Sequence, residues 1–442
     1  MTDIPVRELA LDALMEILEE GRFCHIVIGR TLDKYAYLPR QDRAFLKRVT
    51  EGTVEYRIRA DYILGLYSSV KVSRMKPLIR TLLRMSVYQI FEMDRVPDSA
   101  VCNEAVKLAK KRGFRGLAGF VNGILRNISR NKDTITWPDD EIRYSMPAWL
   151  IDRWSREYGR ETCLRMLEAF AGESRVTVRI NSGKKTREEV LHLLEQDGAS
   201  MIPLYPENGV YILDYSGAPD NLTAFREGLL AIQDLSSSLA GDAAGIREGD
   251  LVLDVCGAPG GKALHAAEIM HGTGQVIVRD LSEEKVERIR ENIARSGYEN
   301  VRAEVFDARE FDPDLEGKCD IVIADLPCSG LGVIGRKPDI RYHASEEGIA
   351  SLAALQREIL PVVCRYVKPG GTLVYSTCTT TGEENIDNFR WLVKESGFLP
   401  VDITDRFPEG LRKETMKEGY VQLLPGTDPC DGFFISVLSR KE

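Results

Sequence analysis

Two cysteines occupy matching places in separate strand-like segments. Residues 321–329 read IVIADLPCS and place Cys328 just after an apolar run, and residues 373–380 read LVYSTCTT and place Cys378 in the same way. A thiol at such a place has four candidate uses: a filler of the core, a metal ligand, one half of a redox pair, or part of a covalent mechanism. The surrounding residues help to separate these uses.

The distribution of the cysteines argues against metal sites and disulfides. Zinc sites need clustered Cys and His ligands, whereas this sequence has no CxxC pair and only five dispersed histidines. The sequence begins without a signal-peptide pattern, so we expect a cytoplasmic protein with reduced thiols, no metal and no disulfide framework. Most of the nine cysteines are expected to be small buried hydrophobes: Cys24, Cys102, Cys163, Cys256, Cys319, Cys328, Cys364, Cys378 and Cys430.

A glycine-rich turn follows a third apolar segment. Residues 254–262 read DVCGAPGGK, and a helical pattern begins directly afterwards. Glycines let the backbone approach a ligand at a helix N-terminus, where free N–H groups favour an anionic group. The turn is neither a P-loop, because Cys256 and Ala263 stand where Gly and Ser/Thr are required, nor a dinucleotide fingerprint, because there is no GxGxxG.

Acidic residues end the strands that come after the glycine turn. Asp280 comes about 20 residues after the turn, a separation that suits a carboxylate binding ribose hydroxyls. Asp307 and Asp325 end the next two strand-like segments. Because ligands bind beyond the carboxyl ends of parallel strands, three acidic ends around one glycine turn favour a nucleoside-type cofactor, and S-adenosylmethionine fits this arrangement.

Two thiols, a carboxyl group and a methyl donor are the components that methylation of cytosine at C5 requires. C5 is too weak a nucleophile on its own, but addition of a thiolate to C6 makes it enamine-like. A carboxylic acid near N3, which would suit Asp325, stabilises the charge shift, and a second thiol assists release. Cys378 precedes Thr381-Gly-Glu-Glu384, a capping-box pattern that predicts a helix start and hence a more acidic thiol. These residues alone leave open which thiol attacks.

Three regions are expected to position these residues. Residues 1–137 show helical periodicity, with apolar stripes such as Ala10, Leu14 and Ile17. Residues 138–230 predict a small α+β module, and residues 231–442 alternate strands with helices. Such alternation predicts an α/β domain with a mostly parallel sheet that is covered on both faces.

Composition and charge describe a soluble protein with a basic N-terminal part. Of 442 residues, 43% are apolar and 29% are charged, and no apolar run is long enough to span a membrane. Residues 1–140 carry 24 Lys and Arg against 18 Asp and Glu, whereas the remainder carries 35 against 50. This distribution permits RNA binding through a local basic patch, despite the net charge of -9.

The motifs together resemble a known enzyme family. The 256–262 turn, the strand-end aspartates, Asp325-Leu-Pro-Cys328 and Thr377-Cys378 are similar to motifs of the NOL1/NOP2/Sun group of RNA 5-methylcytosine methyltransferases. The segments PDIRY (338–342) and LLPGTDPCDGFF (423–434) also resemble that group. Residues 1–130, with FVNGILRNISR, resemble the NusB RNA-binding fold, and the whole chain resembles bacterial members that modify small-subunit ribosomal RNA.

The resemblance implies a fold, a reaction and a set of site residues. It implies a Rossmann-like S-adenosylmethionine-dependent methyltransferase domain after an all-α NusB-like domain and a small α+β module. The implied reaction is methylation of cytosine C5 in small-subunit (16S) ribosomal RNA, with cytosine 967 as the candidate position. Cys378 would be the nucleophile, Cys328 would assist product release and Asp325 would contact cytosine N3. The implied cofactor contacts are Cys256, Gly257, Ala258, Pro259, Gly260, Gly261, Lys262, Asp280, Asp307 and Asp325.

Other interpretations stay open. The same chemistry would serve transfer RNA or another ribosomal site, and an RNA-binding assembly factor with a vestigial catalytic domain would share the NusB-like region. A dithiol redox role is a further alternative. Ribosomal RNA is the expected partner, with the Arg336-Lys337 loop as a candidate phosphate contact, and the protein is expected to act as a monomer away from membranes.

Overall fold

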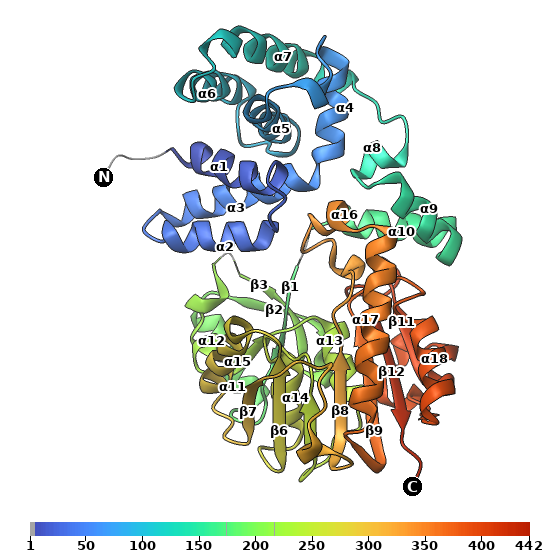
Figure 1. The fold of residues 1–442 in the computed structure, drawn as a ribbon. Coiled ribbons are helices and arrows are strands. Elements are labelled where there is room, and N and C mark those ends of the chain that lie inside the picture. Colours follow the sequence, from blue (N-terminus) through green and yellow to red (C-terminus); the bar gives the residue numbers. More distant parts are fainter. Residues whose placement is uncertain (1–4, 174, 216) are drawn as a thin grey trace. The chain divides into compact units, whose positions relative to one another are not determined.

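The structure, a computed structural model, describes residues 5–173, 175–215 and 217–442. Helices dominate the N-terminal part, a small antiparallel sheet comes next, and a larger sheet with covering helices completes the chain (Figure 1). This is the fold class that the sequence predicts.

The backbone forms two compact units, which do not follow a single cut in the sequence. One unit contains the chain up to Ala171 together with the later segment 334–343. The other contains 172–333 and 344–442. The three-domain division predicted from the sequence, with boundaries after residues 137 and 230, stays a prediction.

The first unit is built from helices. Its α-helices are α1 (Val6–Leu18), α2 (Cys24–Lys34), α3 (Arg40–Glu55), α4 (Arg57–Tyr67), α5 (Pro77–Glu92), α6 (Asp98–Lys111), α7 (Ala118–Asn131), α8 (Asp140–Tyr144), α9 (Ala148–Tyr158), α10 (Arg160–Ala171) and α16 (Ile340–His343). The predicted stripe of α1 is confirmed, because Ala10, Leu14 and Ile17 are all buried. Helix α5 buries residues all round its surface, as expected for the central helix of a bundle.

The segment 334–343 is held in this helical unit by buried polar contacts. Asp339 accepts a 2.7 Å hydrogen bond from the N–H of Cys24, the first residue of α2, so that it caps a helix distant in sequence. Arg341 is buried and donates to the carbonyl of Ser145 at 3.1 Å. The hydroxyl of Tyr342 donates to the carbonyl of Glu55 at 2.9 Å. These contacts hold the segment within the helical unit, although it follows β8 in the sequence.

The second unit begins with a four-stranded antiparallel sheet. Its strands are β1 (Val176–Ile180), β2 (Ser200–Tyr205), β3 (Val210–Asp214) and β4 (Leu230–Ile232), in the order β2-β3-β1-β4. Two helices belong to this module, α11 (Arg187–Gln196) and α12 (Thr223–Arg226). The capping box of Thr186 and Glu189 fixes the start of α11, and this helix buries its apolar residues with those of the sheet.

The larger sheet has five parallel strands and an antiparallel edge. Its strands are β5 (Leu251–Asp254), β6 (Gln275–Asp280), β7 (Val301–Val305), β8 (Cys319–Asp325), β9 (Val367–Thr377), β10 (Leu399–Pro400), β11 (Tyr420–Leu423) and β12 (Phe433–Ser439). The order is β10-β12-β9-β8-β5-β6-β7, with β11 paired to β12. Strands β5 to β9 run parallel to one another, and β12 runs antiparallel to β9.

Alternate residues of these strands build two separate cores, one on each face. Val252 and Ile323 pack on one face with α13 (Leu235–Ala243), α14 (Gly261–Ile269) and α15 (Glu283–Ser296). Leu253 and Val322 pack on the other face with α17 (Glu346–Cys364) and α18 (Ile386–Ser396) (Figure 1). Because helices cover both faces of this parallel sheet, residues on both faces of its strands must be apolar, which explains the continuous apolar runs in the sequence.

The order of the strands reverses between β5 and β8. From β5 the chain proceeds outward through β6 and β7, and it then returns to the other side of β5 for β8 and β9. Ligands of open α/β sheets bind at such a switch point, beyond the carboxyl ends of the strands. Asp254 ends β5 and Asp325 ends β8, so the fold places both carboxylates there.

Candidate active site

The two strand-end cysteines lie in direct contact. Cys328 follows β8 and Cys378 follows β9, and these strands are neighbours with Asp325 opposite Ser376. The Sγ atoms of Cys328 and Cys378 are 3.4 Å apart. The neighbouring strand ends thus bring the two thiols into contact, as expected from the sequence, whereas their chemical roles stay predictions.

The loop after Cys328 is fastened to the loop after Cys378 through the backbone. The N–H of Gly332 donates to the carbonyl of Cys378 at 3.1 Å, and the N–H of Gly432 donates to the carbonyl of Gly332 at 3.0 Å. A Cβ on Gly332 would lie 1.9 Å from the carbonyl oxygen of Gly432. Only glycine allows this approach, so the Gly-Leu-Gly sequence after Ser329 has a structural reason.

The Cys328 thiol is held in its protonated form. The hydrogen bond with Cys378 and burial of the side chain raise the pKa of Cys328 well above its ordinary value, and the negative charges of Glu384 and Asp325 add to this shift. A protonated thiol is a weak nucleophile but a proton donor. This state suits an assisting role for Cys328 better than an attacking one.

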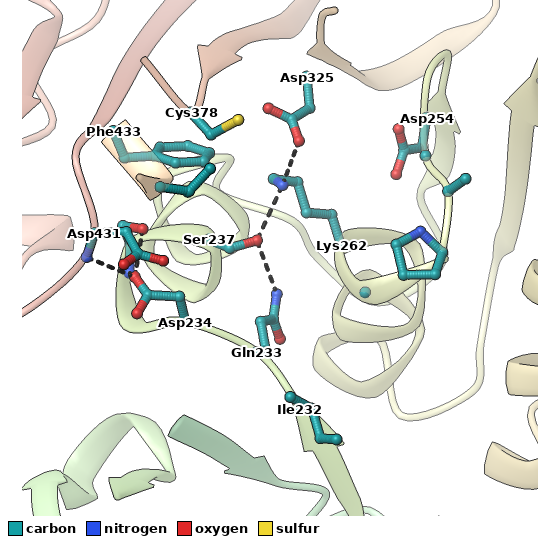
Figure 2. Close-up of a pocket in the computed structure, with 16 residues that line it drawn as sticks. Ile232, Gln233, Asp234, Ser237, Asp254, Lys262, Asp325, Cys378, Asp431 and Phe433 are labelled. Carbon is teal, nitrogen blue, oxygen red and sulfur yellow. Dashed lines mark hydrogen bonds and ion pairs between the residues drawn. The ribbon is translucent and has the colours of Figure 1, made fainter. Parts of the chain in front are cut away.

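Lys262 brings a positive charge to the crevice from the first turn of α14. Its Nζ atom donates to Asp325 Oδ2 at 2.6 Å and to Ser237 Oγ at 3.0 Å (Figure 2). Burial is the largest single influence and lowers the pKa of Lys262, but the charge and hydrogen bond of Asp325, together with Asp254 and Cys378, outweigh it and raise that pKa. A cation beside a thiol favours the thiolate, so Lys262 supplies what a nucleophilic cysteine needs.

The helix start predicted at Thr381 is wrong. Helix α18 begins at Ile386, and its N-cap residue Asn385 makes no side-chain capping bond. Thr381 instead donates its hydroxyl to Glu384 Oε2 at 2.6 Å. The two side chains bond to each other and not to the backbone N–H groups of a helix start. The predicted helix N-terminus is therefore not available to favour a Cys378 thiolate, and Lys262 is the positive group that remains nearby.

A cavity of about 240 Å³ opens beside these groups. The glycine turn forms part of its wall, together with the ends of β5 and β8, the start of β12 and the segment between β4 and α13 (Figure 2). Its lining residues are Ile232, Gln233, Asp234, Ser236, Ser237, Asp254, Gly257, Ala258, Pro259, Gly261, Lys262, Asp325, Val333, Cys378, Asp431 and Phe433. The cofactor turn and Cys378 therefore face one space.

The carboxylate of Asp254 marks where a positively charged group of a ligand would bind. The residue is 0% exposed, neither oxygen has a side-chain hydrogen-bond partner among the described residues, and the neighbouring backbone donor is the N–H of Cys256. Burial raises the pKa of Asp254 to about 7, a shift that the positive charge of Lys262 and the N–H of Cys256 oppose only in part. Buried carboxylates are rarely left unpaired, which indicates that a bound donor completes this one.

The wall of the cavity fits S-adenosylmethionine. Asp254 offers an acceptor for the ammonium of the methionine part, and the N–H groups at the start of α14 suit its carboxylate. Gly260, the residue before α14, has a φ of 103°, a left-handed conformation that glycine adopts readily and that lets the turn lead directly into the helix. The chemistry of the donors and acceptors thus matches the cofactor that the sequence predicts.

The remaining predicted cofactor residues lie around the turn rather than in the cavity wall. Asp280 ends β6 and accepts the N–H of Ala258 at 3.3 Å, so it supports the turn from beneath. Asp307 lies two residues beyond the end of β7, and its carboxylate binds the Arg309 guanidinium at 2.7 Å. Cys256 is the first residue of the turn, and burial is the main reason that its pKa is raised. Their roles as cofactor contacts stay predictions.

Sequence reasoning missed several residues of the cavity wall. Gln233 and Asp234 come from the segment that joins the small sheet to α13, where no motif was apparent. Asp431 and Phe433 belong to the C-terminal segment that was noted only for its resemblance. The sequence therefore contained an indication for Asp431 and Phe433, through the resemblance of their segment, but none for Gln233 and Asp234.

Within residues 5–173, 175–215 and 217–442, no three His, Cys, Asp or Glu side chains are grouped in a way that would hold a metal ion. In the same part of the chain, no helix is long and apolar enough to cross a membrane.

The sheet order, the switch-point cavity and its match to S-adenosylmethionine define the protein as an S-adenosylmethionine-dependent methyltransferase. Models of three families match successive parts of the chain: NusB over 5–130, the ferredoxin-like domain of RsmF/B-like methyltransferases over 146–213, and 16S rRNA methyltransferase RsmB/F over 243–439. The chain belongs to the RsmB/F family of methyltransferases.

Curated relatives match over the full length. The chain is 35% identical to the probable ribosomal RNA small subunit methyltransferase B of Bacillus subtilis, covering 100% of both chains. It is 32% identical to ribosomal RNA small subunit methyltransferase B of Vibrio cholerae, covering 99% of this chain and 98% of the relative.

Solved structures share the fold. The protein PH0851 matches with a TM-score of 0.80 at 24% identity over 99% of both chains. NSun6 from Pyrococcus horikoshii, solved with SFG, matches with a TM-score of 0.60 at 22% identity, covering 67% of this chain and 98% of that one.

Proposed function

We propose that this methyltransferase transfers a methyl group to C5 of a cytosine in small-subunit (16S) ribosomal RNA through a covalent adduct between Cys378 and C6. The observation that carries the proposal is the 3.4 Å contact between the Cys328 and Cys378 thiols at the edge of a cofactor cavity. Full-length similarity to ribosomal RNA small subunit methyltransferase B supports the choice of RNA.

The first step adds the thiolate of Cys378 to C6 of the cytosine. The S–C6 bond forms while the π electrons of the C5–C6 bond shift towards C5 and N3. Lys262 Nζ, 2.6 Å from Asp325 Oδ2, gives a proton to the Asp325 carboxylate, which passes it to N3 as charge develops there. Lys262 also stabilises the thiolate before it attacks.

The second step places the methyl group on C5. S-adenosylmethionine, when bound, supplies a methyl group on a positively charged sulfur. Asp254 and the 256–262 turn hold the cofactor, and Asp280 and Asp307 serve as its further contacts. The chain thereby brings C5 of the adduct and the methyl donor into the same cavity.

The third step releases the product. A base removes the C5 proton, its electron pair re-forms the C5–C6 double bond, and the S–C6 bond breaks with its pair on Sγ of Cys378. N3 returns its proton to Asp325 and so to Lys262. Cys328, in contact at 3.4 Å and held protonated, donates its proton to the departing sulfur and regains one from water.

RNA would be bound through both units. A cytosine must leave its stack to reach Cys378, which is most easily done in a loop or single strand. The basic N-terminal part, with the Arg336-Lys337 loop, would contact phosphates. We further propose a cytoplasmic monomer, with cytosine 967 as the first candidate for the target.

The test is transfer of labelled methyl from S-adenosylmethionine to unmodified small-subunit ribosomal RNA, followed by mapping of the modified base. A label at C5 of one cytosine is expected. If the protein binds the cofactor but labels no ribosomal RNA, the proposal is wrong.

Two alternatives give different results in the same assay. Label on transfer RNA or on another ribosomal site would keep the chemistry and change the target. For a non-catalytic assembly factor, Cys378→Ala would leave the cellular phenotype intact, whereas for an enzyme it would abolish methylation.

A further inference from the structure

Glu384 is a fully buried glutamate that lies between the two cysteine loops. It is 0% exposed and accepts hydrogen bonds from three segments of the chain. The N–H of Ser329 donates to Oε1 at 2.8 Å, and the hydroxyl of Ser329 donates to Oε2 at 2.5 Å. Thr381 adds its hydroxyl at 2.6 Å, and Gln356 of α17 adds its amide at 3.4 Å. Both carboxylate oxygens are therefore fully engaged.

These contacts join the residues that directly follow each thiol. Ser329 is next to Cys328, and its hydroxyl also lies 2.6 Å from the hydroxyl of Thr379, the residue after Cys378. The Glu384 carboxylate thus connects Ser329, which follows Cys328, to the segment that follows Cys378. The separation of the thiols depends on this connection as well as on the strand register.

The glutamate is anchored from the sheet and from α17. The hydroxyl of Tyr375, in β9, donates to the backbone carbonyl of Glu384 and contacts Gln356 Oε1 at 3.1 Å. Gln356 in turn donates to the carbonyl of Pro327, the residue before Cys328, at 2.9 Å. The Pro-Cys-Ser sequence is therefore held on both sides of its thiol.

The carboxylate also acts on Cys328 through its charge. Burial raises the pKa of Glu384, although the hydrogen bonds from Ser329 and Thr381 oppose the shift. When ionised, Glu384 is one of the charges that keep Cys328 in the thiol form. Geometry and charge both favour a Cys328 that can donate a proton to a departing sulfur.

We propose that Glu384 is a positioning residue for product release, which holds Ser329 so that the Cys328 thiol stays in contact with Cys378. The inference rests on the proposed function. It predicts that loss of Glu384 leaves attack by Cys378 in place and slows the breakdown of the adduct.

The test compares Glu384→Ala with Cys328→Ala, Glu384→Gln and Glu383→Ala in the full chain. Purified variants are incubated with S-adenosylmethionine and unmodified ribosomal RNA, and the covalent protein–RNA adduct is followed on denaturing gels. Glu384→Ala should accumulate adduct as Cys328→Ala does, with release slowed roughly 100-fold, as expected when a reacting group is displaced. Glu384→Gln retains acceptor and donor groups and should restore most of the release rate. Glu383→Ala, the matched loss of the neighbouring carboxylate, should release at the parent rate.

The outcomes separate this inference from the proposed function. If the parent labels RNA and Cys328→Ala accumulates adduct, but Glu384→Ala releases at the parent rate, the positioning role is wrong. An equal loss of adduct formation and turnover in both Glu384 variants, with cofactor binding intact, would also contradict it, because it indicates a general structural role. If neither the parent nor Cys328→Ala forms adduct, the proposed chemistry itself fails.

Discussion

Lys262 and Asp325 form a partly buried ion pair, with Nζ 2.6 Å from Oδ2, at the point where the glycine turn meets the end of β8. This pair connects two parts of the site that the sequence presents 63 residues apart. On one side lie the cofactor turn and Asp254, and on the other lie the two thiols. The charges gathered around this pair are expected to control both the attacking thiol and the binding of the cofactor.

Removal of Lys262 should impair the attacking thiol. In Lys262→Met, the thiolate of Cys378 loses its nearby cation, so the rise of the single-turnover rate with pH should move to higher pH. At neutral pH the rate should fall roughly 100-fold, the usual size of an acid–base contribution. Rate measurements from pH 6 to 9 check this, with Lys368→Met, which removes an exposed lysine paired to Asp320, as the control. An unchanged pH profile would show that Lys262 does not act on the thiol.

Asp254 should control cofactor affinity in a pH-dependent way. Its raised pKa of about 7 means that the carboxyl changes its charge near neutral pH, and only the ionised form attracts an ammonium group. Affinity for S-adenosylmethionine should therefore rise between pH 6 and pH 8, and Asp254→Asn should bind roughly 10-fold more weakly without this dependence. Calorimetric titration at three pH values measures both effects. Equal affinities for the two proteins at pH 8 would count against the assignment.

The same carboxyl should give the cofactor-free protein an unusual pH dependence of stability. The folded-state pKa of Asp254 is raised, so the stability that this group contributes is complete at pH below about 4 and is lost as pH rises to about 7. The loss is about 4 kcal/mol at most. Asp254→Asn lacks this loss and should be the more stable protein above pH 7, as measured by urea unfolding across the pH range. Parallel curves for the two proteins would contradict the raised pKa.

Asp339 should stabilise the helical unit. Its carboxylate caps α2 from a distant part of the sequence, and Asp339→Ala leaves the Cys24 N–H without its partner. A loss of about 1 kcal/mol in the free energy of unfolding is expected, as for other lost caps. Thermal unfolding of the full chain checks this against Asp33→Ala, which removes an exposed carboxylate from the same helix. Equal melting temperatures for the two variants would show that Asp339 does not stabilise the helical unit by capping α2.

Local pattern was sufficient to predict the strands and the residues at their carboxyl ends. Parallel strands that are buried on both faces must be short apolar runs, and their ends must gather at one edge, so the sequence alone predicts that Cys328 and Cys378 lie close together. Asp254 stands in the same turn, but its importance lies in being fully buried without a side-chain partner among the described residues, which depends on everything packed around it.

Other parts of the site depend on contacts that sequence spacing does not encode. Thr381 and Glu384 have the spacing of a capping box, yet Glu384 is recruited by Ser329, 55 residues earlier, and the helix starts later. Asp339 and its neighbours follow the catalytic loop in sequence but fold into the helical unit. In both cases a contact with a residue distant in sequence, and not the local sequence pattern, determines the structure.

The most direct test of the account is the identity of the cysteine that becomes attached to RNA. Cys328→Ala, incubated with S-adenosylmethionine and unmodified small-subunit ribosomal RNA, should accumulate an adduct whose peptide, after nuclease and protease digestion, carries a methylated cytosine nucleotide on Cys378 by mass spectrometry. Cys378→Ala should form no adduct. An adduct on Cys328 in the Cys378→Ala protein, or none in either variant alongside normal methyl transfer by the parent, would contradict the assignment of Cys378 as the nucleophile.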